Sequence, residues 1–154
     1  MTKNEISPKA VMKGNEIRAK AVCVVRHEGK ILLIDTHAPD HPEIRVLIPV
    51  GGRIEFGEYS KDTAMRETLE EIGADVVNLR FMGVIENMFS HEGIDYHEHI
   101  FAYEGDFADQ SLYQQEEIHG KEDSGWEFVC RWVEVDLLKS KKVLFFPTQM
   151  LDWL

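Results

Sequence analysis

Residues 51–76 read GGRIEFGEYSKDTAMRETLEEIGADV, which is a pair of glycines followed by a charged helix that ends at Gly73. An α-helix turns by about 100° per residue, so Glu67, Glu70 and Glu71 fall within one arc of about 100°. The side chains on the opposite side are predicted to pack against the protein: Met65, Thr68, Leu69 and Ile72. Like charges three and four residues apart repel each other. A divalent cation would remove this repulsion.

The two glycines before the helix support a cation site. Gly51 and Gly52 carry no Cβ, so their carbonyl groups can approach an ion or a phosphate closely. Hard cations such as Mg²⁺ or Mn²⁺ prefer oxygen ligands and keep several waters, which suits carboxylates together with a carbonyl oxygen. The predicted metal ligands are therefore Gly51, Gly52, Glu67, Glu70 and Glu71.

Two further charged residues are placed to brace these ligands. Arg66 precedes Glu70 by four residues, one helical turn, so its guanidinium can hold that carboxylate. Glu58 lies just before the helix and can reach back to Arg66. The simpler interpretation, that three glutamates on one helix face form a solvated surface, does not account for the glycines, Glu58 and Arg66 at these spacings.

The same spacing resembles the sequence motif of the Nudix hydrolases, the family that includes MutT. Its invariant positions correspond to Gly52, Glu58, Arg66, Glu67, Glu70, Glu71 and Gly73. Two hydrophobic positions of the family pattern hold Thr68 and Ala74 here, a departure that affects packing and leaves every charged position in place.

The resemblance implies an α/β/α sandwich with a mixed β-sheet, and an enzyme that hydrolyses a nucleoside diphosphate linked to another group. The products would be a nucleoside monophosphate and a phosphorylated remainder. Such chemistry needs a cation to neutralise the phosphate oxygens and activate water, and a base to take the proton. We expect the catalytic residues to be Glu67, Glu70, Arg66 and one acid outside the motif, with Glu98 ranked before Glu117 and Glu127.

Composition restricts the class of substrate. A chain of 154 residues fits one domain, preceded by a polar arm of about 17 residues. The net charge of −11 argues against duplex nucleic acid and anionic membranes as partners, and favours a small nucleotide bound through metal. The polar N-terminus predicts a cytoplasmic protein. Cys23 and Cys130 lie in apolar runs and are predicted core residues, although a disulfide between them stays an alternative. A homodimer is also an open alternative.

Strand and turn patterns surround the motif. We expect a hairpin of strands 19–25 and 31–34, a loop over 37–43, and a strand over 45–50 that leads into the glycines. Beyond the helix, strands 76–89 and 96–103 are expected to pair antiparallel, followed by a long loop over 107–124. A strand over 128–135 and an amphipathic helix over 147–154 complete the prediction. The cleft walls are expected from the loops 37–43, 90–95 and 107–124.

Other patterns leave alternatives open. His97 and His99 share a strand face and with His91 could bind a transition metal, although no further ligand has suitable spacing. Three aromatic residues are candidates for stacking on a base: Tyr113, Trp126 and Trp132. Trp132 lies in an apolar run, which favours a core position. The competing functions are a non-catalytic nucleotide sensor, which commonly lacks motif glutamates, and an allylic diphosphate isomerase, which needs a catalytic cysteine.

Overall fold

A computed structural model describes residues 15–38, 40–91 and 93–154, and in this part of the chain it contains nine strands, two α-helices and two short 3-10 helices. The predicted N-terminal arm lies largely outside the described residues. The elements in chain order are β1 (Ile17–His27), β2 (Lys30–Ala38), β3 (His41–Ile48), β4 (Val50–Arg53), α1 (Ser60–Ile72), β5 (Val76–His91), β6 (Ile94–Phe107), η1 (Gln110–Gln114), β7 (Glu117–Lys121), β8 (Glu127–Glu134), α2 (Val135–Lys139), β9 (Leu144–Phe145) and η2 (Thr148–Trp153).

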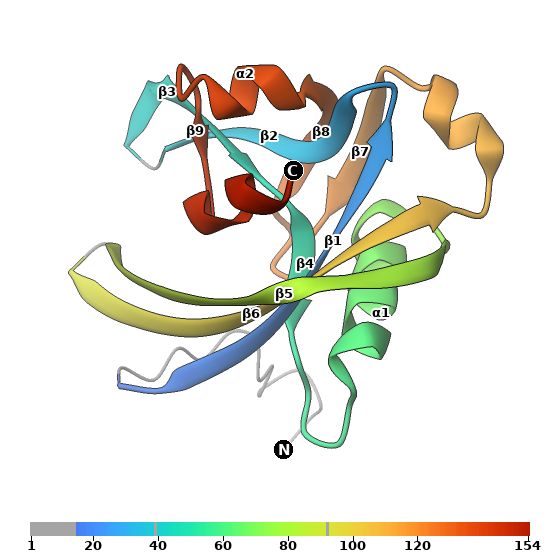
Figure 1. Ribbon diagram of the computed structural model, residues 1–154. Coiled ribbons are helices and arrows are strands. Elements are labelled where there is room, and N and C mark those ends of the chain that lie inside the picture. The colour runs from blue at the N-terminus through green and yellow to red at the C-terminus, as the bar shows by residue number, and fades with distance from the viewer. Residues whose placement is uncertain (1–14, 39, 92) are drawn as a thin grey trace.

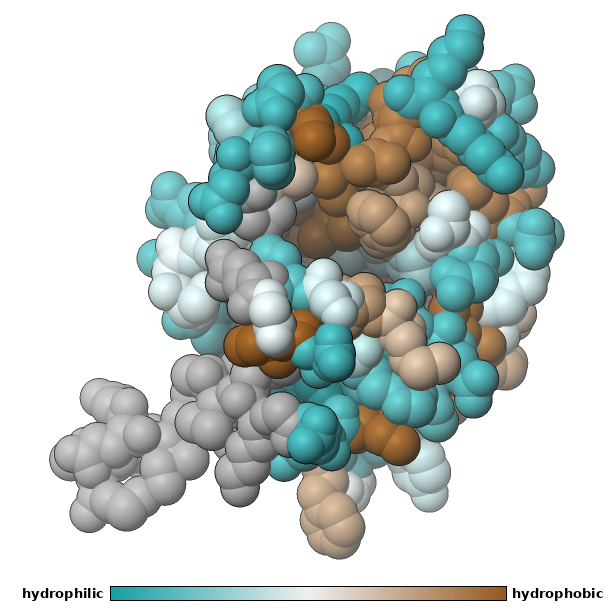
Figure 2. Space-filling model, turned by 90° about the vertical axis from the view of Figure 1, so that its left-hand side faces the viewer, coloured by the Kyte–Doolittle hydropathy of each residue, from teal (hydrophilic) through white to brown (hydrophobic). Residues whose placement is uncertain are grey.

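The strands form a mixed sheet that divides into two sub-sheets. β1 pairs in parallel with β6 and antiparallel with β4, which gives the sub-sheet β5-β6-β1-β4. The second sub-sheet is β7-β8-β2-β3-β9. Among the described residues, strand pairing joins the two sub-sheets where the last residues of β1, Arg26 and His27, pair with the start of β2. Figure 1 shows the sub-sheets diverging from this junction. Figure 2 views the molecule from the left-hand side of Figure 1 and shows a hollow in which hydrophobic side chains gather.

Alternation along β1 sends its side chains into two cores. Ala21 and Cys23 pack in the first core with Ala64 and Ile72 of α1. The intervening residues, such as Val22, pack in the second core, which also contains Leu138 of α2 and Met150 of η2. In Figure 1, α1 and the red C-terminal helices accordingly lie on different sides of β1. The predicted α/β/α sandwich with a mixed sheet is confirmed.

Most predicted elements are present. The hairpin β1–β2 forms, β5 and β6 pair antiparallel as expected, and α1 ends where predicted. Gly73 takes up the left-handed conformation with φ of 67°, and its N–H donates to the Leu69 carbonyl. Cys23 and Cys130 are both free and buried, so the open disulfide alternative is excluded and both are core residues.

Three predicted elements were wrong. Strands β2 and β3 occupy most of the expected loop over 37–43, because the first part of β3 is an exposed edge that tolerates Pro42 and charge. β7 lies within the expected loop over 107–124, and its polar sequence reflects a strand in which only Ile118 is buried. The closing segment is the 3-10 helix η2, not an amphipathic α-helix.

Candidate active site

The side of α1 that faces the protein is only in part the one that was predicted, since Thr68 and Ile72 are buried as expected. Met65 and Leu69 are 38% and 49% exposed, whereas Glu67 is 2% exposed. The prediction that Met65 and Leu69 pack was therefore wrong. The buried positions of α1 are Thr63, Ala64, Glu67, Thr68 and Ile72. α1 lies against both sub-sheets, through β1 and β4 and through β7, so the protein covers the arc that carries Glu67.

Glu67 can be buried because Gly52 leaves space for its carboxylate. A Cβ added to Gly52 would lie 2.6 and 2.7 Å from the two carboxylate oxygens of Glu67, closer than side chains pack. A Cβ on Gly51 would lie 2.8 Å from Cα of Val22 on β1. Both glycines are thus required by close approach, Gly52 to an acidic side chain and Gly51 to a neighbouring strand.

Arg66 joins the acidic residues into one network. Its Nε and Nη2 donate to the two oxygens of Glu58 at 2.7 and 2.9 Å. Its Nη1 donates to Glu67 at 2.9 Å and to Glu70 at 3.2 Å. The guanidinium lowers the pKa of Glu58 to about 2, and the carboxylates raise the pKa of Arg66. Arg66 therefore neutralises part of the acidic cluster and orients Glu67 and Glu70.

We expect Glu58→Gln to lower the free energy of unfolding by roughly 1–3 kcal/mol at pH 7 in EDTA, because it breaks the paired hydrogen bonds to Arg66. The pKa of Glu58 is lowered from 4.5 to about 2, so this contribution is present above pH 4.5 and is lost as the pH falls through 2. Urea unfolding of both proteins at several pH values measures the difference.

Glu55→Gln is the matched control for that variant. Glu55 is exposed and lies 3.8 Å from the same guanidinium, so its replacement is expected to change stability by less than about 1 kcal/mol. A loss for Glu58→Gln that is equal at pH 7 and pH 2 would show that the ion pair is not its cause.

A pocket of about 250 Å³ lies between α1, the start of β1, β4 and the turn between β7 and β8. Its lining combines basic, acidic and small residues: Arg18, Lys20, Gly51, Gly52, Arg53, Glu67, Glu71, Glu122, Asp123 and Ser124. Of the three predicted walls, only the last loop contributes, through its end. The three basic residues and Glu122 were not predicted as site residues from the sequence. The alternation of Arg18 and Lys20 in β1 was an available signal for the first two.

Glu71 is the least satisfied acid of this pocket. Its Oε2 is buried and has no hydrogen-bond partner within the described part of the chain. The pKa of Glu71 is raised to about 8, first by burial and then by the charges of Glu67 and Glu122, while the charge of Lys20 opposes the rise. A hard divalent cation fits this donor set, because it would satisfy the oxygen and offset the repulsion.

The structure separates the three acids ranked outside the motif. Glu98 is 3% exposed and forms ion pairs with Arg18 and with Lys20, the latter at 3.7 Å. It does not itself line the pocket, but both of its partners do. Glu117 pairs with Arg131 at 2.7 Å. Glu127 is exposed on β8. Glu122, in the β7–β8 turn, is the acid outside the motif that lines the pocket together with Asp123.

The remaining candidates lie apart from this pocket. The rings of His97 and His99 are 5.4 Å apart, and that of His91 lies 6.5 Å from Tyr96. Across residues 15–38, 40–91 and 93–154, no three His, Cys, Asp or Glu side chains are already gathered around one point as a metal site, and this holds for the glutamates of α1 as well as for the histidines. Tyr113 and Trp132 are partly buried, stack with ring centres 5.9 Å apart and pack against the first core, as the core interpretation predicted for Trp132.

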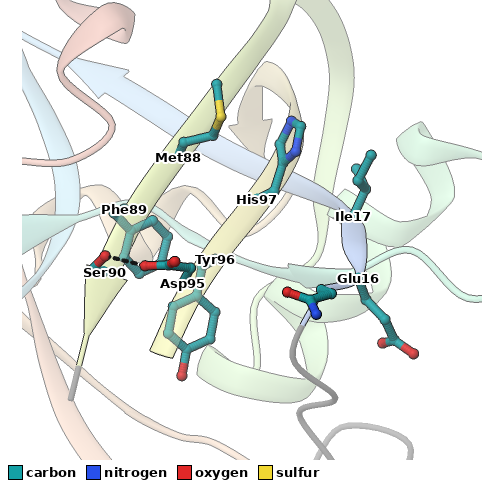
Figure 3. A pocket seen from close by; sticks show the side chains of 9 residues that line it. Glu16, Ile17, Met88, Phe89, Ser90, Asp95, Tyr96 and His97 are labelled. Carbon is teal, nitrogen blue, oxygen red and sulfur yellow. Dashed lines mark hydrogen bonds between the residues drawn. The ribbon is translucent and has the colours of Figure 1, made fainter. Parts of the chain in front are cut away.

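A second, more open hollow of about 480 Å³ lies at the end of the β5–β6 hairpin, beside the first described residues of β1 (Figure 3). Met88 and His97 lie on one face of the hairpin, and Phe89 and Tyr96 on the other. This hollow contains none of the motif residues, so the smaller pocket is the candidate active site.

None of the helices in the described residues has the length and apolar character needed to cross a membrane.

Comparisons with known proteins agree with this geometry. The sequence profile of the NUDIX domain matches residues 16–154. The structure is similar to the crystal structure of a MutT NUDIX hydrolase from Burkholderia pseudomallei, with a TM-score of 0.66 and 20% identity over 91% of this chain and 99% of that chain. A NUDIX hydrolase from Nitrosomonas europaea gives a TM-score of 0.60 and 20% identity over 89% and 85% of the two chains. The solution structure of the E. coli ORF135 protein gives 0.53 and 16% over 90% and 88%. At these identities the structural similarity concerns the fold, whereas the domain profile spans nearly the whole chain, and the protein therefore belongs to the Nudix hydrolase family.

Proposed function

We propose that this Nudix hydrolase cleaves the diphosphate bond of a nucleoside diphosphate linked to another group, in the presence of Mg²⁺ or Mn²⁺. The observation that carries the proposal is the meeting of opposite charges in one pocket. Glu67 and Glu71 lie beside Gly51 and Gly52, and three basic residues line the same pocket: Arg18, Lys20 and Arg53. Carboxylates are suited to binding a metal ion, and cationic side chains are suited to binding phosphate oxygens.

The residues that would hold the metal are Glu67, Glu70, Glu71 and a carbonyl of Gly51 or Gly52. Nudix hydrolases generally use divalent metal ions. When bound, the cation neutralises phosphate charge and lowers the pKa of the attacking water. Arg66, itself held by Glu58, donates to Glu67, which lines the pocket, and to Glu70, which follows one helical turn later outside that lining.

Basic residues would bind the diphosphate, and a carboxylate would accept the proton. Arg18, Lys20 and Arg53 offset the negative charge of the substrate, which acidic residues alone would repel. Water adds to one phosphorus atom, the bridging P–O bond breaks, and the proton of the water passes to a carboxylate. We assign the role of proton acceptor to Glu122, which lines the pocket from the β7–β8 turn, whereas the metal-holding glutamates belong to α1.

The net charge of −11 supports a small anionic substrate over duplex nucleic acid, since it would repel a polyanion everywhere except at the few basic side chains. The isomerase alternative needs a reactive cysteine. Burial raises the pKa of Cys23 and of Cys130 to about 12, so neither supplies a thiolate at neutral pH.

The test is a panel of nucleoside diphosphates linked to sugars, nucleosides or phosphate, incubated with Mg²⁺ and analysed for products. We expect a nucleoside monophosphate and a phosphorylated remainder from at least one class. Binding of these nucleotides without release of any phosphorylated product would instead identify a nucleotide sensor.

Metal is expected to stabilise the protein as well as to activate it. Since bound Mg²⁺ relieves repulsion around Glu71, a concentration of about 100 times Kd should raise the Tm by about 5–10 °C. Differential scanning calorimetry with EDTA and with Mg²⁺ measures this shift. Glu71→Gln should lose most of it, whereas Glu127→Gln, on an exposed β8 position, should keep it. Full hydrolysis after exhaustive EDTA treatment would refute the metal requirement.

A further inference from the structure

We propose that Arg18 and Lys20 form an anion-binding pair for a phosphoryl group of the substrate, and that Glu98 is the positioning residue that holds both. The inference deepens the proposed function by assigning residues of β1 and β6 to substrate binding. The observation behind it is the buried carboxylate of Glu98, which lies outside the motif.

Glu98 is 3% exposed and lies in register with Arg18 on the neighbouring parallel strand. Arg18 Nη2 donates to Glu98 Oε2, and Lys20 Nζ lies 3.7 Å from the same oxygen. A buried carboxylate is costly unless it is paired. The two basic side chains share the single carboxylate of Glu98, and both also line the pocket.

The guanidinium of Arg18 is also held by aromatic rings. Its Cζ lies 4.9 Å from the ring centre of Tyr96, in a cation–π contact. Tyr96 in turn stacks on Phe89, with ring centres 4.9 Å apart and planes 11° apart. Figure 3 shows these two rings on the same face of the β5–β6 hairpin. The Arg18 side chain is only 14% exposed, so Glu98 and Tyr96 fix its orientation before any ligand arrives.

A fixed guanidinium beside a more mobile ammonium is suited to phosphate. The planar guanidinium directs its donors, and the Lys20 side chain, 30% exposed, adds a point charge that can adjust. Neither residue belongs to the motif that holds metal. Because the donors of both side chains are charged and already held in place, the pair should bind a diphosphate weakly even without metal.

This property gives a test that does not depend on catalysis. Inorganic pyrophosphate is titrated into the full-length protein in EDTA, and Kd is measured by isothermal titration calorimetry at low ionic strength. We expect measurable binding by the wild type, and a Kd that rises at least about 10-fold in Lys20→Met, because a direct charge contact is lost.

Glu98→Gln distinguishes positioning from simple electrostatics by the sign of its effect. Removal of a negative charge beside the pocket would by itself tighten anion binding. Loss of the group that holds Arg18 and Lys20 should instead weaken pyrophosphate binding, by about 10-fold for a residue that orients a ligand-binding group. A lower Kd in Glu98→Gln would overturn the positioning role, and an unchanged Kd in Lys20→Met would overturn the anion-binding pair.

Arg26 and Glu104 provide a matched control on the same two strands. Arg26 donates to Glu104, again between β1 and β6, but neither residue lines the pocket. Glu104→Gln should therefore leave the Kd for pyrophosphate unchanged. Circular dichroism and the Tm of each variant confirm that the protein is folded. If Glu98→Gln does not fold, the decision rests on Lys20→Met, whose side chain is partly exposed.

Kinetics with an active substrate separate this inference from the proposed function. Lys20→Met and Glu98→Gln should raise KM at least about 10-fold with a smaller change in kcat, because they weaken binding. Glu70→Gln should keep pyrophosphate binding in EDTA. If no substrate is hydrolysed although Lys20→Met abolishes pyrophosphate binding, the anion-binding pair stands and the hydrolase proposal fails. If hydrolysis occurs and KM is unaffected in both variants, the hydrolase proposal stands and the anion-binding pair fails.

Discussion

Glu70→Gln is expected to lower kcat by about 10³-fold while the protein stays folded, because it removes a charge that would hold the metal in the transition state. Glu70 is 42% exposed, so its replacement by an amide of the same shape costs little packing. Steady-state kinetics with saturating Mg²⁺, together with the Tm, measure both effects. Activity within about threefold of the wild type would remove Glu70 from the catalytic site.

Glu71→Gln should be equally inactive but should differ in stability. Its carboxylate is buried, has an oxygen without a partner in the described residues, and is repelled by Glu67 and Glu122. The neutral amide removes that repulsion, so the variant is expected to melt at a higher temperature than the wild type in EDTA. Loss of activity combined with a gain in stability is the pattern expected of a residue that is maintained for function.

Gly52→Ala is expected to lower activity by about 10²-fold, because the new methyl group would occupy the space of the Glu67 carboxylate and displace it. The added Cβ would lie 2.6 Å from Glu67 Oε1, whose side chain is buried and bonded to Arg66. We also expect roughly 1–3 kcal/mol of lost stability from this overpacking. Kinetics and urea unfolding give the two values.

A double-mutant cycle identifies the cause of the Gly52 effect. In a Glu67→Ala background the clash is absent, so Gly52→Ala should cost much less stability than in the wild type. Gly51→Ala is the matched control, because its Cβ would contact Val22 and the Ala21 backbone, which Glu67→Ala leaves in place. Equal costs for Gly52→Ala in both backgrounds would show that Glu67 does not impose the glycine.

The local features of residues 51–73 could be predicted because they depend on neighbours in sequence. The stop of α1 at Gly73, the reach of Glu58 to Arg66 and the bond from Arg66 to Glu70 all follow from helical geometry over a few turns. The alternating strands on either side were predictable for the same reason, since side-chain period is a local property.

The side of α1 that faces the protein could not be predicted in this way. Its apolar residues suggested that Met65 and Leu69 are buried, but both are largely exposed and Glu67 is buried. Hydrophobic periodicity identifies the buried arc only where the buried partners are apolar. Here the partner is the backbone of Gly52, which makes room for a carboxylate, and Arg66 supplies the compensating charge.

The sequence alone therefore determined the family motif, the glutamates that are candidates for metal binding, and the mixed α/β class. Only the tertiary structure decided what surrounds those glutamates. Arg18 and Glu98 lie 80 positions apart and meet because β1 and β6 pair in parallel. Glu122 reaches Glu71 because β7 and β8 fold their turn over α1. Such contacts depend on strand order and register across the whole sheet, and no local spacing of residues encodes them.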